Sequence, residues 1–316
     1  MREIGGYLEL DTYRLPMLHD GALALNCGRN ALAYLILAKN IRKICLPWFL
    51  CSSVRQVCEK YGVQIRHYRI QADFSPEDLS LEDEEWLYVV NAYGQLSSAC
   101  LQQLVGRYVR VIVDNAQNYF AAPLPGVDTL YSCRKYFGVA DGAFLYTDAR
   151  LEKPLPRDES FERMHFVLGR YERTASEFYA ESAANNRFFA QEPIRKMSRL
   201  TENLLHAIDY AAVKARRTEN AALLARQLQD VNRLEVVPVE GAFMYPLLLE
   251  DAQPIRQRLQ ERKIYIPTLW PNVPEDVPQH WREWDYARNI LPLPCDQRYG
   301  AEQMQDMIAE VYKCID

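Results

Sequence analysis

Short apolar segments and segments of helical periodicity alternate through the first half of the chain. Four segments have the apolar or alternating pattern of strands: 43–48, 63–70, 85–94 and 109–114. Three segments have helical composition or capping signals: 31–39, 52–62 and 97–108. This alternation predicts a mostly parallel sheet that is covered by helices on both faces. A sheet of this kind binds ligands at the carboxyl ends of its strands.

The second half of the chain has a different pattern. The segment from 152 to about 192 is charged and has no clear period, and 197–231 has the apolar stripe of one or two long helices. Shorter elements follow: strands at 233–239 and 242–249, a helix at 254–261 and another from Ala301. We therefore predict a large α/β domain at 1–195, and a linking helix with a small α+β domain at 196–316.

Composition and charge narrow the class of protein. Hydrophobic residues make up 49% and charged residues 25% of the chain, as in ordinary globular proteins. The net charge of −5 does not favour nucleic-acid binding, and the apolar stretch 31–38 is too short to span a bilayer. The eight cysteines are scattered without a Cys-x-x-Cys pair, which favours a reducing cytoplasm without disulfides or a metal site. We expect a cytoplasmic protein with no nucleic-acid or membrane partner.

A lysine lies among aromatic and apolar residues in the stretch LYSCRKYFGVADGAFLYTD, residues 130–148. Two strand-like pieces flank a glycine-containing loop there: 129–134 and 142–147. Because burial of an unpaired ammonium is costly, Lys135 either reaches solvent at the strand end or is kept neutral and used in chemistry.

Two further candidates lie at the ends of elements. Asp114 closes a buried strand, where it either caps the next turn or holds a cationic ring nitrogen. Gly28 precedes the first helix, where backbone N–H groups can bind a phosphate with help from Arg29 or Asn30. The alternative is an ordinary helix start that Asn30 caps. Together, a helix start, an acid at a strand end and a lysine on the next strand are the groups that hold pyridoxal phosphate.

Six motifs extend this set along most of the chain. They are NCGRNALAYLI (26–36), LPWFLCSSV (46–54), VVNAYGQL (89–96), VIVDNAQNYF (111–120), YSCRKYFGVADGAFLYTD (131–148) and NILPLPCDQRYGAEQMQDMI (289–308). In this order the chain resembles the fold-type I pyridoxal-phosphate enzymes, and among them the DegT/StrS-type sugar aminotransferases. The Asp-x-Ala-Gln and lysine-loop motifs are the specific ones. The resemblance implies an α/β fold with a mostly parallel, seven-stranded sheet.

The resemblance also implies roles for residues at the matching positions. Lys135 would form the Schiff base with the cofactor and carry protons, and Asp114 would pair with the pyridinium nitrogen. Ala116 would pack on one face of the ring, and Gln117 would hydrogen-bond the ring hydroxyl. Arg134 would disfavour the charged form of Lys135, although it could equally face solvent or the phosphate. The main phosphate candidates are Gly28, Arg29, Asn30 and Ser132.

Several features depart from the family pattern. Cys51 and Asn91 stand at cofactor-facing positions where the family usually has an aromatic residue and a histidine. Asp114 and Lys135 are 21 positions apart (135 − 114), which is a shorter connection than the family usually has. The neighbouring subunit normally sends an asparagine to the phosphate. Its nearest counterparts here are Asn185 and Asn186.

The resemblance implies a homodimeric aminotransferase that moves an amino group from glutamate to a keto-sugar, expected to be nucleotide-linked, in polysaccharide or secondary-metabolite synthesis. Candidates for binding the donor carboxylate are Arg217, Arg282 and Arg288. Two alternatives stay open: another pyridoxal-phosphate reaction such as elimination or dehydration, and a non-catalytic binding or regulatory protein. Lys135 argues against dehydration, because the dehydratases of this family lack that lysine.

Overall fold

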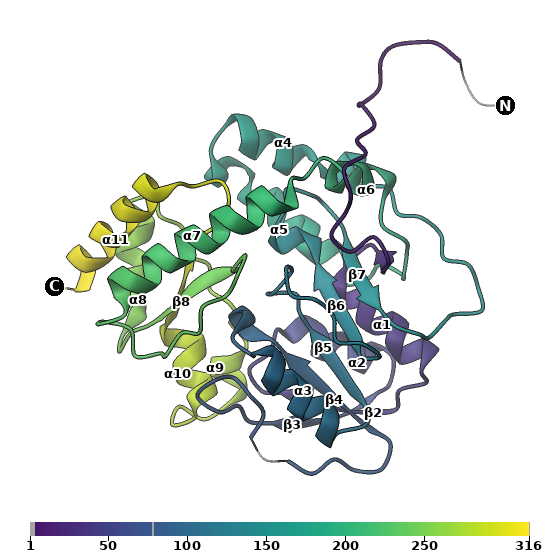
Figure 1. Ribbon diagram of the computed structural model, residues 1–316, viewed down its shortest axis with the longest axis horizontal. Helices are drawn as coiled ribbons and strands as arrows, with labels where there is room; N and C mark the ends of the chain where they lie inside the picture. The colour runs from purple at the N-terminus through teal and green to yellow at the C-terminus, as the bar shows by residue number, and fades with distance from the viewer. Residues whose placement is uncertain (1–3, 78, 316) are drawn as a thin grey trace.

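The computed structural model describes residues 4–77 and 79–315. Its centre is a seven-stranded sheet in the order β1-β7-β6-β5-β4-β2-β3 (Figure 1). The strands are β1 (Leu23–Leu25), β2 (Lys43–Pro47), β3 (Gln64–Tyr68), β4 (Glu85–Val90), β5 (Val111–Asp114), β6 (Asp128–Ser132) and β7 (Ala143–Tyr146). The α/β fold with a seven-stranded, mostly parallel sheet is therefore confirmed.

The direction of the strands decides where a ligand site can form. All strands of this sheet except β7 run the same way, because β7 lies antiparallel between β6 and β1 and the other neighbouring strands are parallel. The carboxyl ends of β1, β2, β4, β5 and β6 consequently lie at one edge of the sheet. This is the edge at which sheets of this type bind ligands.

Helices connect the strands along the chain, and α1, α2 and α3 pack on the large sheet. The α-helices are α1 (Gly28–Ala38), α2 (Ser52–Lys60), α3 (Ser98–Arg107), α4 (His165–Glu172), α5 (Tyr179–Phe188), α6 (Arg199–Leu205), α7 (Tyr210–Leu228), α8 (Ala252–Glu261), α9 (Val273–Asp276), α10 (Arg282–Asn289) and α11 (Ala301–Ile315). Short 3₁₀ helices are η1 (Ala92–Gly94), η2 (Cys133–Lys135), η3 (Phe161–Arg163) and η4 (Ala175–Phe178).

Both faces of the large sheet are covered, which explains why its strands β2, β4 and β5 are mainly apolar. Ile44 and Ile112 pack in a cluster with apolar residues of α1 and α2. The neighbouring Cys45 and Val113 point to the opposite face, where they join a cluster that includes Leu101 of α3. Successive strand residues therefore serve two separate cores.

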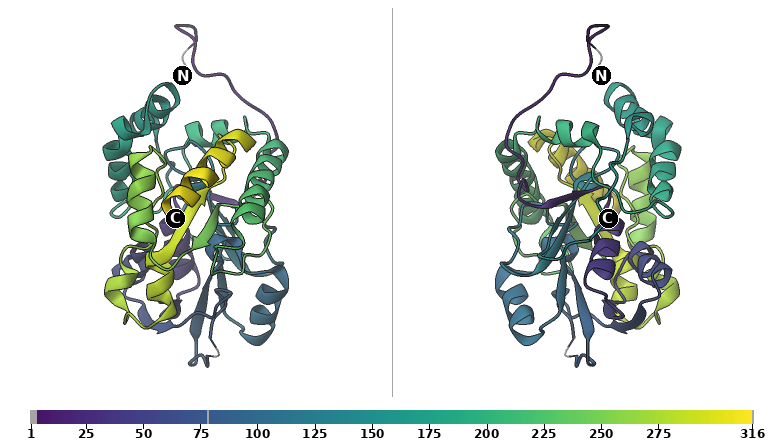
Figure 2. Two further views of the ribbon diagram at one scale, coloured as in Figure 1. Left: turned by 90° about the vertical axis from the view of Figure 1, so that its left-hand side faces the viewer. Right: turned by 90° about the vertical axis from the view of Figure 1, so that its right-hand side faces the viewer.

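The C-terminal part has a core of its own around a second sheet. Strands β8 (Met244–Leu248) and β9 (Ile290–Pro294) pair antiparallel, and their buried residues pack with residues of α7, α8 and α11. Figures 1 and 2 show α7 running along the molecule beside this sheet. The domain boundary at residue 195 stays a prediction.

The segment 197–231, predicted as one or two helices, forms two, α6 and α7, which a break at 206–209 separates. The strand predicted at 233–239 is wrong: this segment is irregular, and the N–H of Val237 donates to the Gln95 side chain (2.7 Å) rather than to a neighbouring strand.

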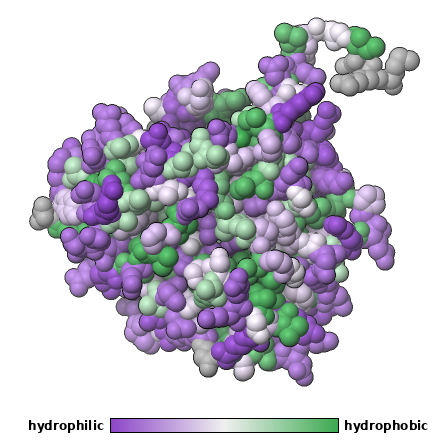
Figure 3. Space-filling model, viewed as in Figure 1, coloured by the Kyte–Doolittle hydropathy of each residue, from purple (hydrophilic) through white to green (hydrophobic). Residues whose placement is uncertain are grey.

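The N-terminal segment that begins at Ile4 extends away from the rest of the protein (Figure 2). Ile4, Tyr7 and Leu8 are 97–99% exposed. On the face drawn in Figure 3, hydrophilic residues prevail and hydrophobic residues are interspersed. Among the described residues, the helices are too short or too polar to cross a membrane.

Candidate active site

The polar residues predicted at strand ends lie at a common edge of the sheet. Asp114 ends β5 and is in register with Leu130 of β6. Ser132 ends β6, and Lys135 ends η2, which follows directly. Gly28 begins α1, which follows β1 at the same edge. The common direction of β1, β5 and β6 thus brings the predicted lysine, acid and phosphate-binding residues to one side of the sheet.

The Asp114 carboxylate is held in a fixed orientation. Its Oδ2 accepts a hydrogen bond from the hydroxyl of Tyr88 (2.8 Å), and its Oδ1 accepts one from the backbone N–H of Ala116 (2.8 Å). The second bond is the turn-capping contact of a strand-ending aspartate. Because a carboxylate has about four acceptor positions and Asp114 is partly exposed, it caps the turn and can also accept a hydrogen bond from a ligand.

Gln117 is buried and stabilises the turn after β4. Its Oε1 accepts a hydrogen bond from the backbone N–H of Tyr93 (2.7 Å), whose φ of 54° is in the left-handed region. This bond uses the carbonyl end of the Gln117 amide, and the Nε2 end would be the donor if a ring hydroxyl bound here. The neighbouring Ala116 is buried and small.

Asn91 has a structural role inside the protein. It is 1% exposed, its Nδ2 donates to Asn115 Oδ1 (3.0 Å), and its Oδ1 accepts from the backbone N–H of Leu96 (2.9 Å). Both ends of the amide are therefore used to fix the loops after β4 and β5 relative to each other.

Positive charge gathers at the start of α1. Cys27 precedes the helix without a side-chain capping bond, and the first turn has no acidic residue. Arg29 donates to the backbone carbonyl of Asn186 (2.7 Å), and Arg134 donates to the side-chain oxygen of that residue. Burial lowers the pKa of Arg134 to about 10, and the nearby charges of Arg29 and Arg163 act in the same direction. A phosphate group would meet two guanidinium groups and the N–H groups of a helix start here.

Asn30 and Gly28 differ in how they contribute to the start of α1. Asn30 is buried, and its Nδ2 donates to Asn26 Oδ1 (2.9 Å) and to the carbonyl of Pro193 (2.8 Å). It lies inside α1, whose N-cap is Cys27, so the alternative that Asn30 caps the helix is wrong. Gly28 has open space where a Cβ would stand.

Lys135 is exposed. This agrees with the first of the two alternatives, in which the side chain reaches solvent at the strand end. Its Nζ lies 5.7 Å from the centre of the Phe243 ring, which belongs to the segment leading into β8. The amine is thus accessible from outside while an aromatic ring from the C-terminal part borders it.

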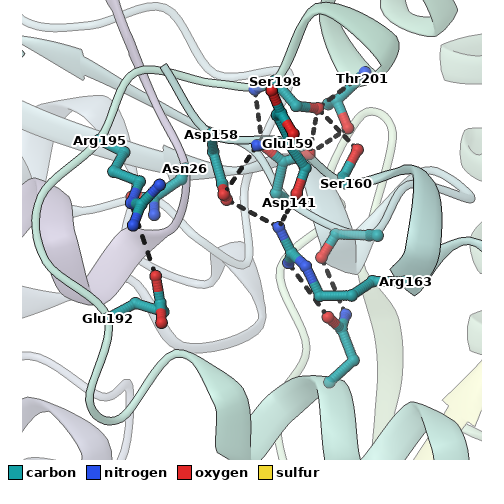
Figure 4. Close-up of polar contacts among 12 residues, drawn as sticks. Asn26, Asp141, Asp158, Glu159, Ser160, Arg163, Glu192, Arg195, Ser198 and Thr201 are labelled. Carbon is teal, nitrogen blue, oxygen red and sulfur yellow. Dashed lines mark hydrogen bonds and ion pairs between the residues drawn. The ribbon is translucent and has the colours of Figure 1, made fainter. Parts of the chain in front are cut away.

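A buried carboxylate anchors the loop that carries Lys135 (Figure 4). Asp141 is 0% exposed, its Oδ2 accepts from the backbone N–H of Ser198 (2.8 Å), and its Oδ1 accepts from the hydroxyls of Ser198 (2.7 Å) and Thr201. Burial raises the pKa of Asp141, although these hydrogen bonds oppose the shift. This anchor was not predicted from the sequence, where its signal is a charged residue in the otherwise apolar GVADGAF (138–144).

Asn185 and Asn186 lie against the lysine loop of their own chain. Asn185 is buried, and its Nδ2 donates to the carbonyl of Ala140 (2.8 Å) while its Oδ1 accepts from Arg163 (3.3 Å). Asn186 is exposed and holds Arg29 and Arg134, as described above. These contacts therefore place both residues beside the candidate phosphate site of the same chain, at the start of α1.

Cys51 is exposed at the start of α2, and the two aromatic residues before it pack elsewhere. Trp48 stacks on His67 with ring centres 4.0 Å apart. Phe49 is 1% exposed and packs on Trp270 (4.3 Å between ring centres). Neither ring replaces the aromatic residue that the resemblance leads one to expect at position 51.

The three candidate arginines for a donor carboxylate have different surroundings. Arg217 is 2% exposed and donates to the carbonyls of Ala242 (2.9 Å), Phe243 (3.3 Å) and Tyr136 (3.3 Å). Arg217 is therefore engaged with backbone groups rather than open to a substrate.

The other two candidate arginines belong to α10. Arg282 donates to the carbonyl of Ile70 (2.8 Å). The Arg288 guanidinium lies 5.1 Å from the centre of the Trp284 ring. Nothing in their contacts favours either of them as the carboxylate-binding residue.

The order of the strands, the antiparallel β7 and the lysine between β6 and β7 define a known class of fold. The chain has the fold of the sugar aminotransferases, which it matches over more than nine-tenths of its length. No protein-family model matches the chain, and the search of curated proteins gave no match either.

Three solved structures represent this fold. DesV from S. venezuelae, in complex with a ketimine intermediate, is 17% identical, with 92% of this chain and 84% of that chain covered and a TM-score of 0.67. A putative sugar aminotransferase from Streptococcus pneumoniae, in its PMP form, is 14% identical, with 93% and 87% covered and a TM-score of 0.66. A DegT DnrJ EryC1 StrS aminotransferase from Brucella abortus is 14% identical, with 93% and 86% covered and a TM-score of 0.60.

Proposed function

We propose that the protein is a pyridoxal-phosphate-dependent aminotransferase that transfers an amino group from glutamate to a keto-sugar. The observation that carries the proposal is the convergence, at one sheet edge, of Lys135, Asp114 and the positively charged start of α1. The similar solved structures are described as sugar aminotransferases, and one is a PMP form. This supports the cofactor and the class of acceptor.

The residues at this edge fit the three reactive parts of pyridoxal phosphate. Arg29, Arg134 and the N–H groups of α1 suit the phosphate, since the two guanidinium groups there contact an amide and a carbonyl instead of a carboxylate. Asp114 has acceptor positions for the ring nitrogen, and the exposed Lys135 has an amine for the aldehyde. Ala116 leaves room for one face of the ring.

The chemistry divides between the cofactor and the protein. When bound, pyridoxal phosphate supplies an aldehyde that exchanges with amines and a ring that withdraws electrons from the reacting carbon. Asp114 would keep the ring nitrogen protonated, and its bonds to Tyr88 and Ala116 hold it in position for this. The Lys135 amine would first hold the cofactor and then move a proton at the reacting carbon.

The cellular setting and the assembly belong to the same proposal. We expect a cytoplasmic homodimer that acts on a nucleotide-linked keto-sugar, with glutamate as the donor. The eight cysteines are free thiols, which suits a reducing compartment. Light scattering on the purified protein tests the dimer, and amino transfer to nucleotide-linked and free keto-sugars in parallel tests the linkage.

The visible absorbance of the purified protein tests the proposal. We expect a yellow protein whose band is fixed by borohydride and bleached by glutamate. Lys135→Ala and Lys135→Arg should both lack the borohydride-fixed adduct, and the arginine variant keeps the positive charge as a matched control. A parent protein that stays colourless after addition of pyridoxal phosphate would contradict the proposal and leave a non-catalytic protein of this fold as the alternative.

A further inference from the structure

Arg217 is an arginine in the interior with several hydrogen bonds and no ion pair among the described contacts. It lies on α7 and is 2% exposed. Its Nη1 donates to the carbonyls of Ala242 and Phe243 (2.9 and 3.3 Å), and its Nη2 donates to the carbonyl of Tyr136 (3.3 Å). A buried charge is costly unless its polar atoms are hydrogen-bonded. The planar guanidinium has five donors, and these acceptors satisfy several of them.

Two of these acceptors flank the Lys135 amine. Tyr136 is the residue after Lys135, and Phe243 carries the ring that lies 5.7 Å from the Lys135 Nζ. The Arg217 guanidinium also lies 4.4 Å from the centre of the Tyr136 ring. A single side chain of α7 therefore binds the backbone of the residue after Lys135 and the backbone of the residue whose ring borders the amine.

Gln297 completes the arrangement from the C-terminal part. Its Oε1 accepts a hydrogen bond from the Nε of Arg217 (2.7 Å), and its Nε2 donates to the carbonyl of Tyr136 (2.8 Å). The Tyr136 carbonyl thus accepts two hydrogen bonds, one from each of these side chains. The pair connects the segment after β9 to the lysine loop directly.

We propose that Arg217, assisted by Gln297, is the positioning residue of Lys135: it holds the Tyr136 peptide and the Phe243 backbone so that the amine points to the aldehyde of the cofactor. This inference rests on the proposed function. It replaces the expectation that Arg217 binds a donor carboxylate, because its donors are engaged with carbonyl groups and with Gln297.

The test measures how fast Lys135 of the full-length protein, freed of cofactor, reacts with added pyridoxal phosphate. The adduct is trapped with borohydride at short times and quantified by mass spectrometry of the peptide that contains Lys135. We expect Arg217→Gln to slow labelling at least tenfold, and Arg217→Lys to resemble it because an ammonium lacks the planar fork. Arg216→Gln is the matched control, since Arg216 is exposed on the same helix and its guanidinium lies 3.6 Å from the Glu219 carboxylate.

A second variant keeps the test decisive if Arg217→Gln does not fold. Gln297→Glu retains the acceptor for Arg217 but removes the hydrogen bond to the Tyr136 carbonyl, so Lys135 labelling should fall at least threefold. Labelling of the exposed Lys263 and the far-ultraviolet circular dichroism should stay as in the parent.

The possible results separate this inference from the proposed function. Lys135 labelling within twofold of the parent in folded Arg217→Gln, or in Gln297→Glu where the former does not fold, overturns the positioning role and leaves the proposed function standing. A parent protein that gives no adduct on Lys135 overturns both.

Discussion

The carboxylate of Asp141 accepts hydrogen bonds from both the backbone N–H and the hydroxyl of Ser198. Ser198 is the N-cap of α6, and its own hydroxyl oxygen accepts from the backbone N–H of Thr201 (3.1 Å). Asp141 follows Lys135 by six positions (141 − 135). The carboxylate therefore joins the lysine loop to the start of a helix that lies 57 positions away in the chain.

Replacing Asp141 by alanine should destabilise the protein by about 3 kcal/mol or more, because three buried donors lose a charged acceptor. Urea unfolding followed by circular dichroism measures the change. Asp230→Ala is the control, since Asp230 is exposed at the end of α7, and it should stay within about 0.5 kcal/mol of the parent. A loss below about 1 kcal/mol for Asp141→Ala would show that the anchor contributes little.

Gly142 is required by its backbone conformation and by its neighbours. Its φ is +115°, and a Cβ there would lie 3.1 Å from both Cys133 Cβ and Thr201 Cγ2. Gly142→Ala should therefore lower the free energy of unfolding by about 1–3 kcal/mol. Gly21→Ala serves as the control, because a Cβ at Gly21 meets no atom within 4 Å. Equal unfolding midpoints for the two variants would refute the prediction.

His19 should make the stability of the protein depend on pH. It is 2% exposed, its Nε2 lies 2.8 Å from the carbonyl oxygen of Tyr119, and burial lowers its pKa to about 4. Between this value and about pH 6.5, the unfolded chain binds a proton that the folded protein excludes. The stability that neutral His19 contributes is thus fully present above pH 6.5 and is lost as pH falls toward 4.

The measurement compares the parent with His19→Gln, which cannot titrate. From about pH 7.5 to about pH 4.5, the parent should lose about 2.5 kcal/mol more of its free energy of unfolding than the variant. Urea unfolding at both pH values gives this difference. Identical pH profiles would mean that the pKa of His19 does not change on folding, and would contradict the prediction.

The sequence predicted most of the large sheet because its strands are buried on both faces. β2, β4 and β5 consist mainly of apolar residues, which single them out. β1 has only three residues, too few for a pattern to appear. Residues 233–239 have the pattern of a strand, but in the described part of the chain they form no ladder. The N–H of Arg233 donates to the carbonyl of Leu248 in β8 (2.9 Å), whereas the N–H of Val237 donates to the Gln95 side chain.

The strand-end residues of the candidate site were predictable for a similar reason. Asp114 and Lys135 stand directly after or near the ends of parallel strands, so topology alone brings them to one edge. The partners of the lysine loop could not be predicted, because Asn186 and Ser198 lie 52 and 57 positions from the residues that they contact. Such contacts depend on the tertiary packing of segments that are far apart in the sequence, which local patterns do not encode.

Arg134 and Arg29 both donate to Asn186 at the start of α1. If the Arg134 guanidinium binds the cofactor phosphate, Arg134→Gln should weaken pyridoxal-phosphate binding at least about tenfold, or roughly 1.4 kcal/mol. Affinity for pyridoxal, which lacks the phosphate, should stay unchanged. Titration of cofactor-free protein followed by absorbance measures both constants. Arg170→Gln is the control, because Arg170 is exposed and donates only to the carbonyl of Arg173 among the described contacts. An equal loss for both ligands would assign Arg134 to the fold of the loop rather than to the phosphate.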